Sequence, residues 1–164
     1  MTLTFTVPGG DCNQAGRASG EVKKVLARLG VDPVIIKRAA VSMYEAEINM
    51  VIHAGGGTAV AEISPERVVL TLEDTGPGIP DLELAMREGY STAPEWIREL
   101  GFGAGMGLPN MRRNSDELAI DSAPGRGTRV TIVLRLDGGG ASAENRAAPA
   151  EAPAGTAPAA EAAP

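Results

Sequence analysis

The chain has 164 residues, of which 43% are hydrophobic and only 3% aromatic, and its formal net charge is -6. This length allows one domain with an aliphatic core, and the acidic balance argues against nucleic acid as a partner. The single cysteine, Cys12, excludes an intrachain disulfide and a cysteine-cage metal site. No apolar run reaches the roughly 20 residues of a membrane span, and the N-terminus lacks the basic flank of a secretion signal. A cytoplasmic protein without membrane contact is therefore predicted.

The N-terminal third is predicted to form one strand and two helices. Alternating polar and apolar side chains over residues 2–7 indicate a strand, and because this strand comes first in the chain we expect it at an edge of the sheet. The apolar spacing that follows predicts a helix with Ser19 as its N-cap. A longer helix should begin at Asp32 and Pro33, a good cap and a good first residue, and run to about Ala54. Its buried face is predicted to comprise Val34, Ile35, Ala39, Val41, Ile48, Val51 and Ile52.

Three polar residues on the long helix are candidates for a site. Glu45, Asn49 and His53 are spaced four apart and therefore share one helix face. A carboxylate and a carboxamide one turn apart can place a proton acceptor beside an oxygen ligand for Mg2+. The alternative is an ordinary solvated polar stripe, which the helix by itself favours. Two glycine-rich turns further along the chain shift the balance towards a site.

The first of these turns follows a predicted hairpin. Residues 58–64 and 67–73 are rich in alternating Val, Ile and Leu, and the second strand ends at Asp74. Gly76 and Gly78 remove the side chains that would keep the backbone away from a planar ligand. A simple loop from strand to helix is the alternative, because Asp-x-Gly turns are common.

The second glycine-rich turn ends a long segment of weak periodicity. A short helix is predicted over residues 81–88, and residues 89–107 then form a loop of a length that is usually functional or mobile. Glycines alternate at the end of this loop, before a predicted helix over residues 108–114. Their backbone donors and the positive end of the helix suit phosphate oxygens, although a flexible hinge without a ligand is the alternative. The pattern is neither a phosphate-binding P-loop nor a Rossmann turn.

Two further strands, over residues 117–122 and 128–136, should complete the domain. From Asp137 the composition changes to Ala, Gly, Pro and Glu, which cannot bury enough apolar area to offset the entropy of ordering. The predicted organisation is one domain over residues 1–136 and a disordered tail over residues 137–164.

The order of these motifs resembles that of the GHKL superfamily of ATPases, which includes sensor histidine kinases and gyrase. Within it, residues 1–136 look most like the small anti-sigma-factor and stress-switch serine protein kinases of bacteria. The resemblance implies an α/β two-layer sandwich of the Bergerat type, with helices on one face of a mixed, mainly antiparallel sheet. It also implies ATP and Mg2+ as ligands.

The resemblance also implies individual roles. Glu45 would be the general base, Asn49 the Mg2+ ligand, and Asp74 the acceptor for the adenine amino group. Gly127 and Thr128 would complete the adenine end. His53 is either a contact near the phosphates or a structural histidine. The implied nucleotide-binding residues are Asn49, His53, Asp74, Gly76, Gly78, Ile79, Phe102, Gly103, Ala104, Gly105, Met106, Gly107, Leu108 and Thr128. The basic residue that meets the γ-phosphate stays open between Arg87, Arg98 and Arg112.

The single histidine separates branches of the superfamily. A sensor histidine kinase needs a phosphoacceptor histidine on a separate helix, whereas His53 lies inside the ATP motif. No second folded domain is expected after Leu136. We therefore expect a serine/threonine kinase that phosphorylates a partner such as an anti-sigma antagonist. An ATP-gated module that binds a sigma factor or an enzyme is the second hypothesis, and an accessory ATPase of a metabolic or redox complex is the third. Homodimerisation stays open.

Overall fold

The computed structural model describes residues 1–10, 12–99 and 101–136. Five strands form one sheet in the order β1-β2-β3-β5-β4, and all four pairings are antiparallel. The strands are β1 (Thr2–Pro8), β2 (Gly56–Ile63), β3 (Arg67–Glu73), β4 (Glu117–Ser122) and β5 (Thr128–Arg135). The predicted edge position of the first strand is confirmed. No parallel pair occurs among the described strands, so the sheet is antiparallel rather than mixed. The predicted disordered tail lies outside the described residues.

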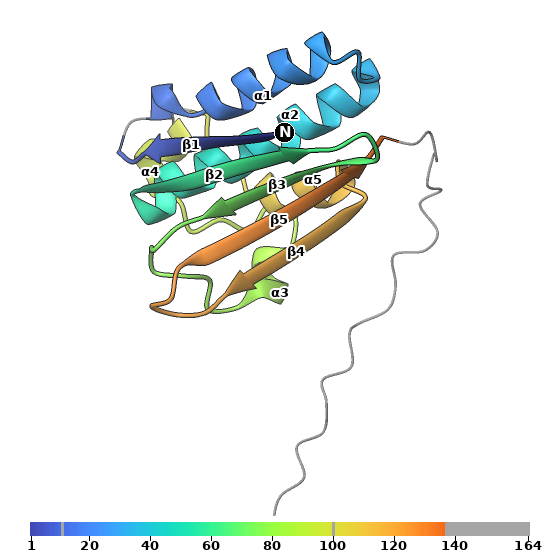
Figure 1. The fold of residues 1–164 in the computed structure, drawn as a ribbon. Coiled ribbons are helices and arrows are strands. Elements are labelled where there is room, and N and C mark those ends of the chain that lie inside the picture. The colour runs from blue at the N-terminus through green and yellow to red at the C-terminus, as the bar shows by residue number, and fades with distance from the viewer. Residues whose placement is uncertain (11, 100, 137–164) are drawn as a thin grey trace, which may run out of the picture.

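The helices lie on one face of the sheet, as Figure 1 shows for α1, α2 and α5, so the expected two-layer sandwich is confirmed. The helical elements are η1 (Cys12–Gln14), α1 (Arg17–Arg28), α2 (Pro33–Asn49), η2 (Met50–Ala54), α3 (Leu82–Ala85), α4 (Glu95–Glu99) and α5 (Gly107–Arg113). No helix within the described ranges is both long enough and apolar enough to cross a membrane.

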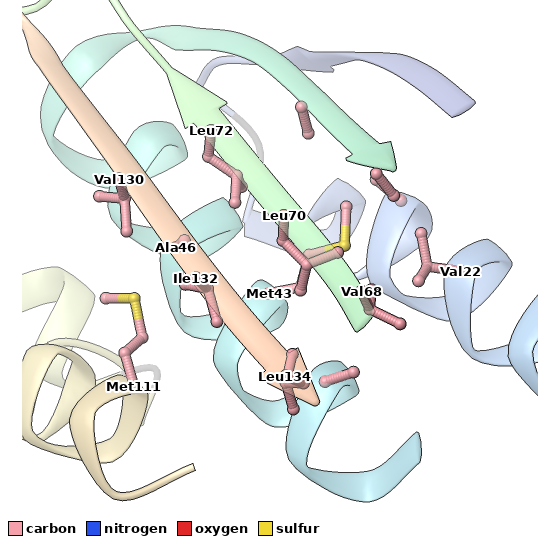
Figure 2. Close-up of a cluster of buried hydrophobic side chains, with 14 of the residues drawn as sticks. Val22, Met43, Ala46, Val68, Leu70, Leu72, Met111, Val130, Ile132 and Leu134 are labelled. Carbon is pink, nitrogen blue, oxygen red and sulfur yellow. The ribbon is translucent and has the colours of Figure 1, made fainter. Parts of the chain in front are cut away.

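The core lies between the helices and the sheet. Alternate residues of β3 and β5, among them Leu70 and Ile132, point inwards and meet Met43 of α2 (Figure 2). This alternation follows from the two-residue period of a strand. Val34, which was predicted to be buried, is 67% exposed. It lies in the first turn of α2, where Ile36 faces the core instead.

The start of α1 differs from the prediction that Ser19 caps it. The helix begins at Arg17 after Gly16, and Ser19 is buried inside the first turns. The cap comes from α2: the Glu47 carboxylate, only 1% exposed, accepts hydrogen bonds from the backbone N–H groups of Gly16, Ala18 and Ser19 at 2.8 to 3.2 Å. A side chain distant in sequence thus satisfies donors that a helix leaves unpaired.

The long predicted helix changes type before it ends. The α-helix stops at Asn49, and Met50–Ala54 forms a turn of π-helix that Gly55 closes in the left-handed region, with φ of 72°. The segment after β3 also differs from its prediction. The helix predicted over residues 81–88 covers only Leu82–Ala85, and the long loop contains α4, which buries Ile97.

Candidate active site

A cavity of about 610 Å³ opens between α2, η2, the end of β3 and the segment before α5. Of the residues predicted to contact the nucleotide, all line it except Gly76 and Gly127. Its volume is in the range of pockets that bind small molecules. Residues predicted from three separate motifs are therefore brought together in one place.

One end of the cavity is built around Asp74. Its Oδ1 atom accepts hydrogen bonds from the backbone N–H groups of Gly76 at 2.8 Å and Thr128 at 3.2 Å. Its own backbone N–H donates to the carbonyl oxygen of Thr128 at 3.0 Å. The second carboxylate oxygen accepts no hydrogen bond from any residue that the structure describes. Asp74 is therefore held rigidly by one oxygen while the other is available to a ligand.

Gly76 has a packing role rather than a place in the cavity wall. A Cβ atom there would lie 2.5 Å from the Cβ of Ala54. The turn after β3 can pack against η2 only because this position is glycine. Gly76 therefore acts on the site through Asp74, whose carboxylate its N–H fixes, and its contact with a ligand stays a prediction.

Ser122 belongs to the same end of the site, and sequence reasoning missed it. Its Oγ accepts from the N–H of Ile79 at 2.8 Å and donates to the carbonyl oxygen of Gly127 at 3.0 Å. Because the hydroxyl has only one hydrogen, the Thr128 hydroxyl, 2.8 Å away, must be the donor between those two residues. Ser122 ties the turn after Asp74 to β5. A serine at the end of an edge strand gives no sequence signal for this role.

The other end of the cavity holds Glu45 and Asn49. Glu45 Oε1 accepts a hydrogen bond from Asn110 Nδ2 at 2.8 Å. A Cβ atom at Gly107 would lie 3.3 Å from both Glu45 Oε2 and Asn49 Nδ2. The first residue of α5 therefore lies directly against the Glu–Asn pair. Asn110 was not predicted, although its spacing of three from Gly107 places both on one helix face.

The glycine run before α5 packs on the preceding loop. The N–H of Gly89 donates to the carbonyl oxygen of Gly105 at 2.9 Å. Gly105 has a φ of 73°, and a Cβ atom there would lie 2.4 Å from the carbonyl carbon of Gly89. Both the backbone conformation and the close approach require glycine. Residues 101–107, which we call the lid, thus cover one side of the cavity.

The charges around the cavity are mostly negative. Glu45, Asp74 and Asp81 line it, and among the residues that the structure describes no lysine or arginine does. The three candidate arginines for a γ-phosphate are therefore not in its wall. His53 lines it from η2. Partial burial lowers the pKa of this imidazole, and the negative charge of Asp74 opposes the shift.

The residues that line the cavity fit a magnesium ion that takes most of its ligands from phosphate oxygens and water rather than from the protein. Within the described ranges, no group of three or more His, Cys, Asp and Glu residues could hold a metal. Mg2+ is commonly held by one or two protein oxygens, with phosphate oxygens and water completing its shell. The amide of Asn49 beside Glu45 matches that donor set.

The fold and the site define an ATPase module. Residues 36–138 match the family described as histidine kinase-, DNA gyrase B-, and HSP90-like ATPases. The chain belongs to this family. The predicted resemblance is thereby confirmed.

Two curated proteins are similar to this chain in sequence. The serine/threonine-protein kinase RsbT of Bacillus subtilis is 31% identical over 118 residues, which cover 70% of this chain and 83% of RsbT. The anti-sigma F factor of Pasteuria penetrans is 39% identical over 99 residues, which cover 56% of this chain and 63% of that protein. The match thus spans less than two thirds of the anti-sigma factor.

Solved structures support the fold alone. The RsbU and RsbW domains of a Mycobacterium tuberculosis protein give a TM-score of 0.57 at 20% identity, over 83% of this chain and 32% of that one. The SiaB–SiaC complex of Pseudomonas aeruginosa gives a TM-score of 0.54 at 14% identity, over 80% of this chain and 88% of that one.

Proposed function

We propose that this protein is an ATP-dependent serine/threonine kinase that phosphorylates a regulatory protein partner in a bacterial partner-switching system. The observation that carries the proposal is that Glu45, Asn49 and Asp74, which come from separate motifs, all line one ligand-sized cavity. The similarity to RsbT and to anti-sigma F factors supports the choice of reaction.

Asp74 would recognise the base of the nucleotide. Its Oδ2 atom would accept a hydrogen bond from the adenine amino group, while Oδ1 keeps its hydrogen bonds from the N–H groups of Gly76 and Thr128. Ile79 and Val130 supply apolar walls beside it, as a planar ring requires. A carboxylate held by two backbone donors is preorganised and need not reorient when the base binds.

Asn49 and the lid would bind the phosphates. Mg2+, when bound through Asn49, neutralises charge on the phosphate oxygens. Residues of the lid line the same cavity, and the backbone N–H groups of its glycines would donate to the phosphate oxygens. They matter here because no described lysine or arginine lines the cavity.

Glu45 would act on the phosphoacceptor. The oxygen of a partner's serine or threonine hydroxyl attacks the γ-phosphorus, and the bond to the β-phosphate oxygen breaks, releasing ADP. Glu45 accepts the proton of the hydroxyl. Phosphoryl transfer depends mainly on positioning and charge stabilisation, so one base and a well-ordered cavity suffice.

A second function is favoured by the surface of the loop before the lid. Trp96 is 57% exposed and Tyr90 is 38% exposed. Aromatic side chains of this kind are enriched at protein interfaces. The protein would then be an ATP-gated module that binds a sigma factor or an enzyme and transfers little phosphate.

Incubation with radiolabelled ATP, Mg2+ and candidate partners tests the proposal. A kinase leaves covalent phosphate on a serine or threonine of the partner. Glu45→Ala should lower transfer by at least about 100-fold while nucleotide affinity stays within about two-fold. Asp74→Asn is the contrasting variant, because it should weaken nucleotide binding, which Glu45→Ala should leave nearly unchanged. Undiminished transfer by Glu45→Ala would contradict the role of Glu45, and ATP-dependent retention of a partner without label would favour the second function.

A further inference from the structure

Glu45, which lies on α2, is held by a side chain of α5. The bond from Asn110 Nδ2 to Glu45 Oε1 measures 2.8 Å, is partly buried and joins residues 65 positions apart. No other residue that the structure describes donates a hydrogen bond to this carboxylate. The orientation of Glu45 therefore depends on Asn110.

The bond divides the two carboxylate oxygens between different surroundings. Oε1 is bonded to Asn110, whereas Oε2 lies beside Gly107 and the Asn49 amide, with both Glu45 and Asn49 lining the cavity. Oε2 accepts no hydrogen bond from any residue that the structure describes, so it is the more available oxygen to accept a proton.

Asn110 is itself held in place. Its backbone N–H donates to the carbonyl oxygen of Met106 at 2.8 Å, and its carbonyl oxygen accepts from Asn114 Nδ2 at 2.9 Å. Met106 belongs to the lid, so the helix turn that carries Asn110 is continuous with the end of the lid.

We propose that Asn110 is a positioning residue that orients the Glu45 carboxylate, with Oε2 towards the acceptor hydroxyl. This inference rests on the proposed function, since it assigns Asn110 a role through the base. Gly107 and Asn110 are three apart on α5, so they share a face. One turn of α5 thus makes two contacts. Gly107, at the end of the lid, lies against Asn49, and Asn110 orients Glu45.

The full chain with Asn110→Ala tests the inference, with ATP hydrolysis as the readout and Mg-ADP binding by calorimetry as the measure of affinity. The maximal rate should fall about ten- to a hundred-fold, because a misplaced base is costly, while ADP affinity stays within about two-fold. Arg113→Ala is the matched control on the same helix, because this exposed residue does not line the cavity, and it should change neither. In Glu45→Ala, adding Asn110→Ala should cause no further loss, because the two residues act together.

The pH–rate profile of Asn110→Asp distinguishes a positioning role from a merely structural one, because a structural role would leave the profile unchanged. A second carboxylate beside Glu45 disfavours the ionised base, so the acidic limb of the pH–rate profile should move to higher pH. If Glu45→Ala is inactive and Asn110→Ala keeps full activity, the inference about Asn110 is overturned and the proposed role of Glu45 is not. Hydrolysis that survives Glu45→Ala overturns the proposed role of the base, and the inference with it.

The hydrogen bond between Asn110 and Glu45 can also be tested by NMR, which does not require ATP hydrolysis. The side-chain amide of Asn110 should give an NMR signal whose chemical shift changes in Glu45→Ala, because the acceptor of its hydrogen bond is removed. An Asn110 side-chain signal that is the same in the parent chain and in Glu45→Ala would overturn the inference.

Discussion

Asp116 shows how a single charged residue can stabilise this fold away from the site. Its Oδ1 accepts from Arg38 Nη2 at 2.6 Å and its Oδ2 from the N–H of Arg135 at 2.7 Å, and the aspartate side chain is only 11% exposed. Burial by itself would raise the pKa of Asp116. The hydrogen bonds from Arg135 and Arg38 and the charge of Arg38 outweigh it, so the pKa is lowered.

We expect Asp116→Asn to lower the free energy of unfolding by about 2 kcal/mol at pH 7, since hydrogen bonds to a charged group are lost. Because the folded-state pKa is the lower one, this stabilisation is present above the unfolded pKa of about 3.9 and is lost as the pH falls through the folded value. Urea denaturation at a series of pH values from 7 to 2.5 should therefore show the difference between the two proteins shrinking as the pH falls.

Glu73 provides the control for Asp116. Its ion pair with Arg129 at 2.8 Å has side chains 53% and 55% exposed. Glu73→Gln should change stability by no more than about 0.5 kcal/mol, since exposed pairs contribute little. Equal losses for the two variants would contradict the role assigned to burial at Asp116.

At the scale of elements, the attachment of α1 to α2 depends on the buried carboxylate of Glu47. Its three bonds to the N–H groups at the start of α1 are the only cap there, because the N-cap residue, Gly16, has no side chain. Glu47→Ala leaves these donors unpaired and should cost about 2 to 4 kcal/mol in the free energy of unfolding. Glu47→Gln keeps one acceptor oxygen and should lose less.

Chemical denaturation measures both Glu47 variants, and amide hydrogen exchange locates the change. Faster exchange in the first turn of α1 is expected, with β3 and β5 less affected. A stability loss spread evenly over the sheet would argue against a cap.

At the scale of the whole molecule, the described strands and helices form one unit, and β5 is the last element that the structure describes. The last described residue, Leu136, donates its N–H to the carbonyl oxygen of Glu66 at 2.8 Å and packs against the core. A chain that stops after Leu136 should therefore keep its unfolding free energy within about 0.5 kcal/mol and its nucleotide affinity within about two-fold. Thermal denaturation and calorimetry with Mg-ATP check both values. A clear loss of either would show that residues 137–164 contribute to the domain.

The elements of this protein could be predicted where their cause is local. Alternating apolar residues predict β1 to β5, and Asp32 with Pro33 predicts the start of α2 because cap and first-turn chemistry involve neighbours only. The same holds for much of the site. Glu45 and Asn49 share a helix face by their spacing, and the turns after Asp74 and before α5 are marked by glycines.

Contacts between distant segments could not be predicted in this way. The start of α1 was misplaced because its cap is Glu47, which meets Ser19 across 28 positions of chain. The bonds of Ser122 to Ile79 and of Asn110 to Glu45 likewise join residues 43 and 65 positions apart. Sequence periodicity reports which face of an element is apolar, and it does not report which polar side chain on a neighbouring element comes within hydrogen-bonding distance.

The sequence by itself therefore determined the order of elements and the residue types of the site, because these follow from local backbone preferences and hydrophobic period. Only the tertiary structure decided that Asp74 is fixed through one oxygen, that Gly76 packs behind the cavity, and that α5 holds Glu45. Those features depend on how the helices pack on the sheet, since packing sets the distances between side chains that no local rule constrains.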